Sequence, residues 1–147
     1  MAAPGKAGAV PPFLDTNVLL YLLSTDAGKA DRAEHLLARG AVVGVQVLNE
    51  FANVARRKLS MSWDEVTDVL GLIRQRCTVR PLTFAVHEQA LQIAPRYDLS
   101  WYDALIVAAA LDGGCARLYS EDMHDGLAIK SALTGSRVVV RNPFAAS

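Results

Sequence analysis

Short apolar runs alternate along this chain with longer segments whose apolar residues recur at helical spacing. The short runs predict five strands, at residues 12–14, 41–45, 77–79, 117–119 and 137–140. The longer segments predict helices at residues 18–23, 29–39, 47–59, 62–75, 83–96 and 101–111. Strands that alternate with helices are typical of an α/β fold with three layers, in which helices cover both faces of a central, mainly parallel sheet of about five strands.

Single residues mark the predicted helix ends. Ser62 and Glu65 form a capping box that opens the helix beginning there. Gly40 should stop the helix before it, because glycine commonly follows a last helical turn. Pro95 should mark the end of helix 83–96, since proline disrupts a helix interior.

The length and composition of the chain fit one globular domain. It has 147 residues, of which 52% are hydrophobic and 20% are charged. Residues 1–12 are small and rich in proline and glycine, so we expect a flexible N-terminal arm followed by a single domain over residues 13–147. No run approaches the roughly 18 apolar residues that a membrane span needs, which favours a cytoplasmic protein without a membrane partner.

Several kinds of site are excluded by the residue pattern. Cys77 and Cys115 stand far apart, without the paired spacing of a thiolate zinc site. No glycine-rich loop follows a predicted strand, as a phosphate-binding loop would. The 15 Lys and Arg residues balance the 15 Asp and Glu residues, so the chain is not a strongly basic nucleic-acid-binding domain. Neutral charge alone leaves RNA open as a partner.

Two aspartates directly follow predicted strands. Asp15 closes the first strand, and Asp122 comes shortly after the apolar pair at residues 118–119. Each has an ordinary alternative role, since Asp15 can cap the next helix and Asp122 can form a turn. In parallel sheets, ligands bind in the crevice outside the carboxyl ends of the strands. We therefore expect both carboxylates at one crevice.

Two further acids lie early in helices. Asp103 opens a helix that is apolar nearly all round, and it shares a face with Val107 and Ala110. A buried anion is costly unless it is paired, and no Lys or Arg lies within one helical turn of Asp103. Glu50 lies beside the buried stripe of its own helix. Taken alone, Glu50 is typical of a solvated first-turn acid.

The four acids together indicate a divalent cation. Without a counter-charge they would repel one another, and their pKa values would rise. Carboxylate oxygens are the ligands that Mg²⁺ prefers. Two such ions can activate a water molecule and stabilise the leaving oxygen in phosphodiester cleavage. Polar residues beside the strand ends either orient these carboxylates or simply cap helices, namely Thr16, Asn17 and Ser120.

The same residues resemble the motif pattern of the PIN domain family. Leu14-Asp15-Thr16-Asn17 resembles its opening motif, and Asn49-Glu50-Phe51 resembles its second acid. The stretch 99–110 around Asp103 resembles the third, and residues 118–122 resemble the fourth. The similarity runs from about Phe13 to residues 142–144. A PIN domain that fills so short a chain looks like the toxin of a VapBC toxin–antitoxin pair.

The resemblance implies a Mg²⁺- or Mn²⁺-dependent endoribonuclease that forms a homodimer and is neutralised by a VapB-type antitoxin. By position, the catalytic acids would be Asp15, Glu50, Asp103 and Asp122, and the metal would be held by Asp15, Asp103 and Asp122. Glu121 and Asp125 supply more acids than the pattern needs. Asp125 is either an accessory group beside the ligands or an ordinary loop residue.

Substrate contacts are suggested only by one basic cluster. Arg56, Arg57 and Lys58 end the helix that carries Glu50 and could hold RNA phosphates. Cations also complement the dipole at a helix C-terminus, which is the simpler interpretation.

The leading prediction is RNA cleavage by a metal-activated water. A first alternative is a non-catalytic PIN-like scaffold that binds RNA or protein. A less favoured alternative is a Mg²⁺-binding phosphoacceptor switch. Such a switch needs a paired acid after the first strand and a lysine near the last, whereas Thr16-Asn17 and the position of Lys130 depart from that pattern.

Overall fold

A single six-stranded sheet organises the protein, whose computed structural model describes residues 9–145. The strand order is β3-β2-β1-β4-β6-β5. All neighbouring strands are parallel except β5, which runs antiparallel to β6. The strands are β1 (Phe13–Leu14), β2 (Ala41–Gly44), β3 (Cys77–Arg80), β4 (Arg117–Tyr119), β5 (Ala128–Lys130) and β6 (Arg137–Arg141).

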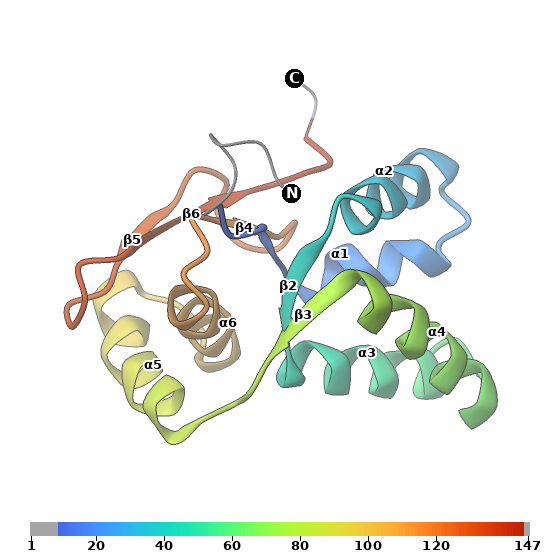
Figure 1. Ribbon diagram of the computed structural model, residues 1–147, viewed down its shortest axis with the longest axis horizontal. Helices are drawn as coiled ribbons and strands as arrows, with labels where there is room; N and C mark the ends of the chain where they lie inside the picture. Colours follow the sequence, from blue (N-terminus) through green and yellow to red (C-terminus); the bar gives the residue numbers. More distant parts are fainter. Residues whose placement is uncertain (1–8, 146–147) are drawn as a thin grey trace.

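Helices cover both faces of this sheet, as predicted for a three-layer α/β fold. Figure 1 shows α5 and α6 on one side of the sheet and α1 to α4 on the other. Their bounds are α1 (Thr16–Leu20), η2 (Tyr21–Leu23), α2 (Ala27–Ala38), α3 (Val45–Arg57), α4 (Trp63–Arg76), α5 (Phe84–Tyr97) and α6 (Trp101–Asp112). None of the helices within residues 9–145 is long and apolar enough to cross a bilayer.

The core is densest around β1 and α6. Phe13 and Leu14 are fully buried because β1 lies in the middle of the sheet, between β2 and β4. In α6, every residue from 104 to 111 is buried. A helix that is apolar on all sides needs cover on all sides, and α6 receives it from α5 and the sheet. Asp103, one residue before this buried stretch, therefore lies at the rim of the core.

Two local features differ from the sequence-based expectations. Strand β5 was not predicted, because its three residues alternate exposed, buried and exposed with only Ile129 in the core. Pro95 does not end α5 but lies inside it, two residues before its end at Tyr97. Proline deprives the carbonyl four residues earlier of its partner, and here that carbonyl belongs to Leu91, an exposed residue whose backbone water can reach. The predicted N-terminal arm falls largely on residues 1–8, which lie outside the described part.

Gly40 and Gly71 form a matched pair for a stability test. Gly40 follows the end of α2 with a φ of +90°, a left-handed conformation, so Gly40→Ala should lower the free energy of unfolding by about 1–2 kcal/mol. Gly71 lies within α4, where an added Cβ would meet nothing within 4 Å. Gly71→Ala should therefore raise the free energy of unfolding by roughly 0.5–1 kcal/mol. Urea denaturation measures both changes, and equal signs would contradict this account.

Candidate active site

Asp15 lies at the carboxyl end of the central strand. Its backbone N–H continues the β1–β4 pairing by donating to the carbonyl of Tyr119 at 3.0 Å. Its Oδ1 accepts from the backbone N–H of Thr16 at 2.7 Å, which caps α1. Its Oδ2 accepts from the Ser120 hydroxyl at 2.8 Å. The capping role and a place at the cleft therefore coexist in one side chain.

Ser120 joins the ends of β1 and β4. The register pairs Leu14 with Tyr119, so the residues that follow them, Asp15 and Ser120, lie side by side. The Ser120 Oγ also accepts from the backbone N–H groups of Asp122 at 3.2 Å and Met123 at 3.4 Å. One fully buried hydroxyl thus fixes both a carboxylate and the loop that carries the next one.

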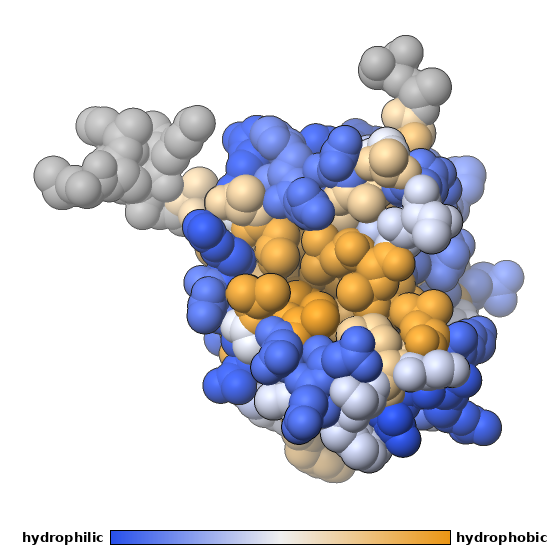
Figure 2. Space-filling model, turned by 90° about the vertical axis from the view of Figure 1, so that its right-hand side faces the viewer, coloured by the Kyte–Doolittle hydropathy of each residue, from blue (hydrophilic) through white to orange (hydrophobic). Residues whose placement is uncertain are grey.

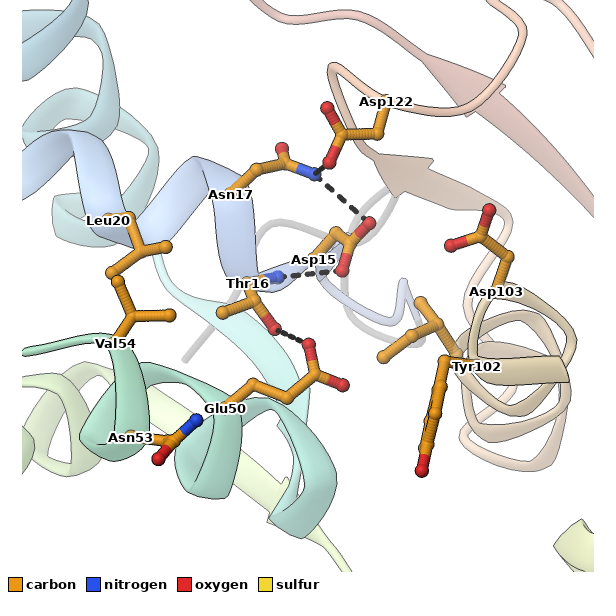
Figure 3. A pocket seen from close by; sticks show the side chains of 11 residues that line it. Asp15, Thr16, Asn17, Leu20, Glu50, Asn53, Val54, Tyr102, Asp103 and Asp122 are labelled. Atoms are coloured by element: carbon orange, nitrogen blue, oxygen red, sulfur yellow. Dashed lines mark hydrogen bonds between the residues drawn. The ribbon is translucent and has the colours of Figure 1, made fainter. Parts of the chain in front are cut away.

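Asn17 links Asp15 to Asp122. Its Nδ2 lies 3.2 Å from the Oδ2 of Asp15 and 3.1 Å from the Oδ2 of Asp122 (Figure 3). Its Oδ1 accepts from the backbone N–H of Glu121 at 3.0 Å. One amide group therefore sets the spacing between two strand-end carboxylates.

Glu50 reaches the same place from α3. Its Oε2 accepts from the Thr16 hydroxyl at 2.9 Å, and its Oε1 accepts from the Gln46 amide at 2.7 Å. Gln46 was not among the predicted site residues, although its place one helical turn before Glu50 is a signal that helical spacing could have supplied. Two donors hold this carboxylate toward the cleft rather than toward bulk solvent (Figure 3).

Asp103 enters from the first turn of α6. Ser100 caps that helix, since its Oγ accepts from the backbone N–H of Asp103 at 3.2 Å. Ser100 also lowers the pKa of the Asp103 carboxyl through a hydrogen bond, against the larger effect of burial, and the carboxylate faces the cleft (Figure 3). The ring of Tyr102 stands beside it as one wall and is 66% exposed.

These side chains enclose a cleft of about 270 Å³ at the carboxyl edge of the sheet. The four predicted acids come together there from four separate segments of the chain. No Lys, Arg or His occurs among the described residues that line it, which are Asp15, Thr16, Asn17, Leu20, Glu50, Asn53, Val54, Tyr102, Asp103, Ile106 and Asp122. The cleft is therefore a concentration of negative charge without an internal counter-charge.

Burial and this shared charge perturb two of the carboxyls. Burial raises the pKa of Asp15 to about 6, and the charges of Asp103 and Glu50 add to the effect against the hydrogen bonds from Ser120 and Thr16. The pKa of Asp103 is also raised, first by burial and then by the charges of Asp122 and Glu50. Both shifts mean that the cleft disfavours the charged form of these carboxyls, an effect that a bound cation would oppose.

The cleft offers the type of donor that a hard divalent cation prefers, but it does not offer a complete set of protein ligands for one ion. Every ionisable group at the cleft other than the Tyr102 hydroxyl is a carboxylate, the donor that Mg²⁺ and Mn²⁺ favour. Within residues 9–145, no three acid, His or Cys side chains converge tightly enough to grip one ion by themselves. Mg²⁺ usually keeps several waters and needs only one or two protein carboxylates. The residues therefore fit an ion that is bound partly through water.

The remaining acids of the β4 loop point elsewhere. Glu121 forms an ion pair with Lys29 at 2.7 Å and accepts a hydrogen bond from the Tyr21 hydroxyl, and the bond from Lys29 holds its pKa below the usual range. Asp125 accepts from the backbone N–H of Asn142 at 3.0 Å and does not line the cleft. Of the three acids in this loop, only Asp122 lines the cleft.

The predicted basic cluster is divided by the structure. Arg56 donates to the carbonyl of Met61 at 2.7 Å and lies over the ring of Trp63 at 4.6 Å, so it closes the turn after α3. Arg57 and Lys58 are exposed. Lys58 lines a hollow that adjoins the cleft, whereas neither arginine lines either of them.

That adjoining hollow is an apolar groove of about 400 Å³. It shares Asn17, Leu20, Val54 and Asp122 with the acidic cleft, and its further apolar lining includes Leu23 and Leu59. Figure 2, which faces the side where α1 to α4 lie, shows apolar residues gathered between polar margins. Exposed apolar surfaces of this kind mark binding sites for other molecules.

Ser120 offers a test of how the carboxylates are held. In Ser120→Ala, Asp15 loses the donor that lowers its pKa and Asp122 loses its backbone anchor, so we expect any cleavage activity to fall about 10–100-fold. Ser131→Ala is the matched control, because Ser131 is equally buried and accepts several hydrogen bonds far from the cleft. Rates per folded molecule, corrected by circular dichroism, separate the two. Equal rate losses would assign Ser120 a purely structural role.

Comparison with known proteins relates the chain to one family. The profile of the PIN domain family matches residues 13–127. A toxin–antitoxin complex from Klebsiella pneumoniae has a TM-score of 0.66 at 16% identity, covering 92% of this chain and 99% of that one. The Sarcin-Ricin loop cleaving toxin VapC20 of Mycobacterium tuberculosis has a TM-score of 0.61 at 22% identity, covering 75% and 88%. FitAcB from Neisseria gonorrhoeae has a TM-score of 0.63 at 17% identity, covering 91% and 99%. No curated protein sequence matches the chain.

Proposed function

This chain belongs to the PIN domain family, as its sequence motifs suggested, and on that premise we propose that it is a metal-dependent endoribonuclease acting as the toxin of a toxin–antitoxin pair. The observation that carries the proposal is the cleft at the carboxyl edge of the sheet. Four carboxylates from β1, α3, α6 and the β4 loop face one another there without a cationic side chain among the described lining residues. A protein that only binds RNA has no reason to hold mutually repelling acids together.

The cation would be held by Asp15, Asp103 and Asp122, partly through water molecules, since the three carboxylates do not converge on one point. When bound, a divalent ion would supply a water of lowered pKa and positive charge to offset the charge developing on the phosphate. Asn17 and Ser120 keep Asp15 and Asp122 at a fixed spacing through the hydrogen bonds described above. These two neutral residues would therefore act as positioning residues for the two carboxylates.

Glu50 has a different role in this proposal. Thr16 and Gln46 each donate one hydrogen bond to it, one to each oxygen, and each oxygen keeps a second lone pair. Glu50 is thus oriented to accept a proton from the water that attacks phosphorus. The exposed ring of Tyr102 at the mouth of the cleft offers a surface on which an unpaired base of the RNA can stack.

An antitoxin is the proposed protein partner. One structural relative is described as a toxin–antitoxin complex from Klebsiella pneumoniae. The apolar groove beside the cleft suits such a partner, because a segment that buries Leu20 and Leu59 would also lie over Asp122. Binding and inhibition would then occur together. We also propose that the chain forms a homodimer, which sedimentation velocity would test directly.

The direct test is cleavage of a mixed RNA pool by the purified protein. With Mg²⁺ or Mn²⁺, we expect discrete cuts in RNA that are absent with EDTA, and a DNA pool of the same length distribution serves as the comparison. Sequencing of the new ends maps the cut sites. Cleavage that persists in EDTA would contradict metal dependence, and a metal-induced rise in melting temperature without cleavage of any RNA would favour a non-catalytic scaffold.

A further inference from the structure

A second hollow of similar size lies at the opposite edge of the sheet. Its volume is about 260 Å³, and its lining comes from residues 9–12, the C-terminal end of α2 and strand β4. Residues 9–12 precede β1, Gly40 precedes β2, and Arg117 begins β4, so the hollow lies toward the amino ends of these parallel strands. The acidic cleft lies at their carboxyl ends. The two sites are therefore separate.

This second hollow is strongly cationic. Arg32, Arg39 and Arg117 line it, and no Asp or Glu occurs among its described lining residues. Within residues 9–145 the ion pairs are Lys29–Glu121 and Arg80–Asp112, so none of the three arginines has a carboxylate partner there. Residues 1–8 and 146–147 contain no Asp or Glu in the sequence. No acidic side chain close to these arginines neutralises them.

Two of the three guanidinium groups are held in place by neutral contacts. The Nε of Arg32 donates to the carbonyl of Pro143 at 3.1 Å. Arg117 donates to the Tyr119 hydroxyl at 3.2 Å and lies 5.8 Å from the centre of its ring. A guanidinium has five N–H donors, so each of these contacts leaves most of them available. Arg32 and Arg117 are thus positioned without being neutralised.

The rest of the lining is apolar and partly rigid. Leu36 is a buried residue of the lining, and Pro11, Pro12 and Tyr119 line the same hollow. Proline has a fixed φ, so this wall is less free to collapse than an ordinary loop. An apolar surface next to three cations suits a ligand with an anionic group on an organic body, rather than a bare ion.

We propose that this arginine pocket, formed around Arg32, Arg39 and Arg117, binds the phosphate group of a nucleotide. The planar fork of arginine matches phosphate oxygens through paired N–H···O bonds, which a lysine cannot provide. The phosphate comes either from a free mononucleotide or from an RNA strand that also extends to other parts of the surface. The pocket goes beyond the proposed nuclease function, because phosphate binding there requires neither a metal ion nor cleavage.

The test follows backbone amide signals of the ¹⁵N-labelled full chain in EDTA, so that no RNA is cut. Sodium phosphate, AMP and a single-stranded oligoribonucleotide are titrated separately. We expect saturating shifts at Gly40, Arg117 and Tyr119. In Arg39→Gln/Arg117→Gln the apparent affinity should fall at least about tenfold, because charge-assisted hydrogen bonds are removed. Arg74→Gln/Arg96→Gln removes the same charge from exposed positions outside the pocket and should bind like the wild type.

The three ligands distinguish the source of the phosphate. Saturation by AMP or phosphate assigns the pocket to a small ligand. Saturation by RNA alone assigns it to a strand, and the slope of log K against log salt should then become shallower by about 0.7 for each phosphate that the double variant no longer neutralises. If the double variant does not fold, the single exposed-site variant Arg39→Gln gives the same comparison. Absence of saturating shifts at the pocket with all three ligands, or equal weakening in the control variant, would overturn the proposal. None of these results depends on whether the acidic cleft cleaves RNA.

Discussion

Asp103→Asn should abolish RNA cleavage while leaving the fold intact. The substitution replaces a carboxylate proposed to hold the cation with a neutral amide, so the loss should exceed the roughly 10–100-fold expected for a residue that only supports a ligand. The helix start is preserved, because the capping bond runs from the backbone N–H of Asp103 to the Ser100 Oγ and does not need the carboxylate. The measurement is the initial cleavage rate of a defined RNA at saturating Mn²⁺, together with a thermal melt.

Asp125→Asn is the matched control for this experiment. It makes the same chemical change in an acid that the sequence also suggests as a group beside the metal ligands. Asp125, however, accepts a hydrogen bond from the backbone N–H of Asn142 and does not line the cleft. An asparagine oxygen can accept the same hydrogen bond, so we expect a rate close to that of the wild type. A large loss in Asp125→Asn with little loss in Asp103→Asn would reverse the two assignments.

Asp15→Asn should stabilise the metal-free protein and remove most of its stabilisation by metal. The folded protein binds the Asp15 proton more tightly than the unfolded chain does, since burial raises its pKa from 3.8 to about 6. The free energy of unfolding of the wild type therefore falls as the pH rises from about 4 to above 6, and then levels off. At neutral pH this pKa change lowers the free energy of unfolding of the wild type by roughly 3 kcal/mol. Asp15→Asn should regain at most this amount, because asparagine cannot keep every hydrogen bond that Asp15 accepts.

Thermal melts across pH provide the measurement. In EDTA at pH 7.5 we expect Asp15→Asn to melt roughly 5 °C above the wild type, with the difference shrinking towards pH 4. With Mn²⁺ the order should reverse, because a ligand at 100 times its Kd adds about 2.7 kcal/mol to a protein that binds it. Asp68→Asn, an exposed acid on α4, should change neither curve. A lower melting temperature for Asp15→Asn in EDTA at pH 7.5 would refute the account.

The sequence pattern was informative wherever local and global preferences agreed. Both reciprocal hydrogen bonds of the capping box at Ser62 and Glu65 are formed, because both lie within one helical turn. The five predicted apolar runs are strands of the sheet, where their local apolar pattern agrees with the need to bury apolar side chains. Strand β5 was missed because an edge strand with one buried residue has no periodic signal.

The composition of the cleft was predictable, but the roles of neighbouring acids were not. Spacing alone cannot separate Glu121, Asp122 and Asp125, which lie within five positions of one another. Their partners come from distant segments, namely Lys29 for Glu121 and Asn142 for Asp125. In the same way Arg56 belongs to the turn at Met61 and Trp63 rather than to a surface cluster. Tertiary contacts of this kind cannot be predicted from the local spacing of residues in the sequence.

The arginine pocket was also invisible in the sequence. Its residues are spread from α2 to β4, and Arg32, Arg39 and Arg117 do not form a basic run. They meet only in the folded chain, where α2 and β4 line the same hollow. A chain with zero net charge can thus separate an anionic cleft from a cationic pocket at opposite edges of one sheet.

The pairing of β1 with β4 has a consequence for the order of events during synthesis. Asp15 is among the first described residues to be made, yet its hydroxyl partner Ser120 is 105 residues later. Asp103 and Asp122 also come from the last third of the chain. A growing polypeptide therefore cannot complete the cleft until residues 103–122 have been synthesised. Any activity of the cleft would arise only after β4 and the loop that follows it have paired with β1.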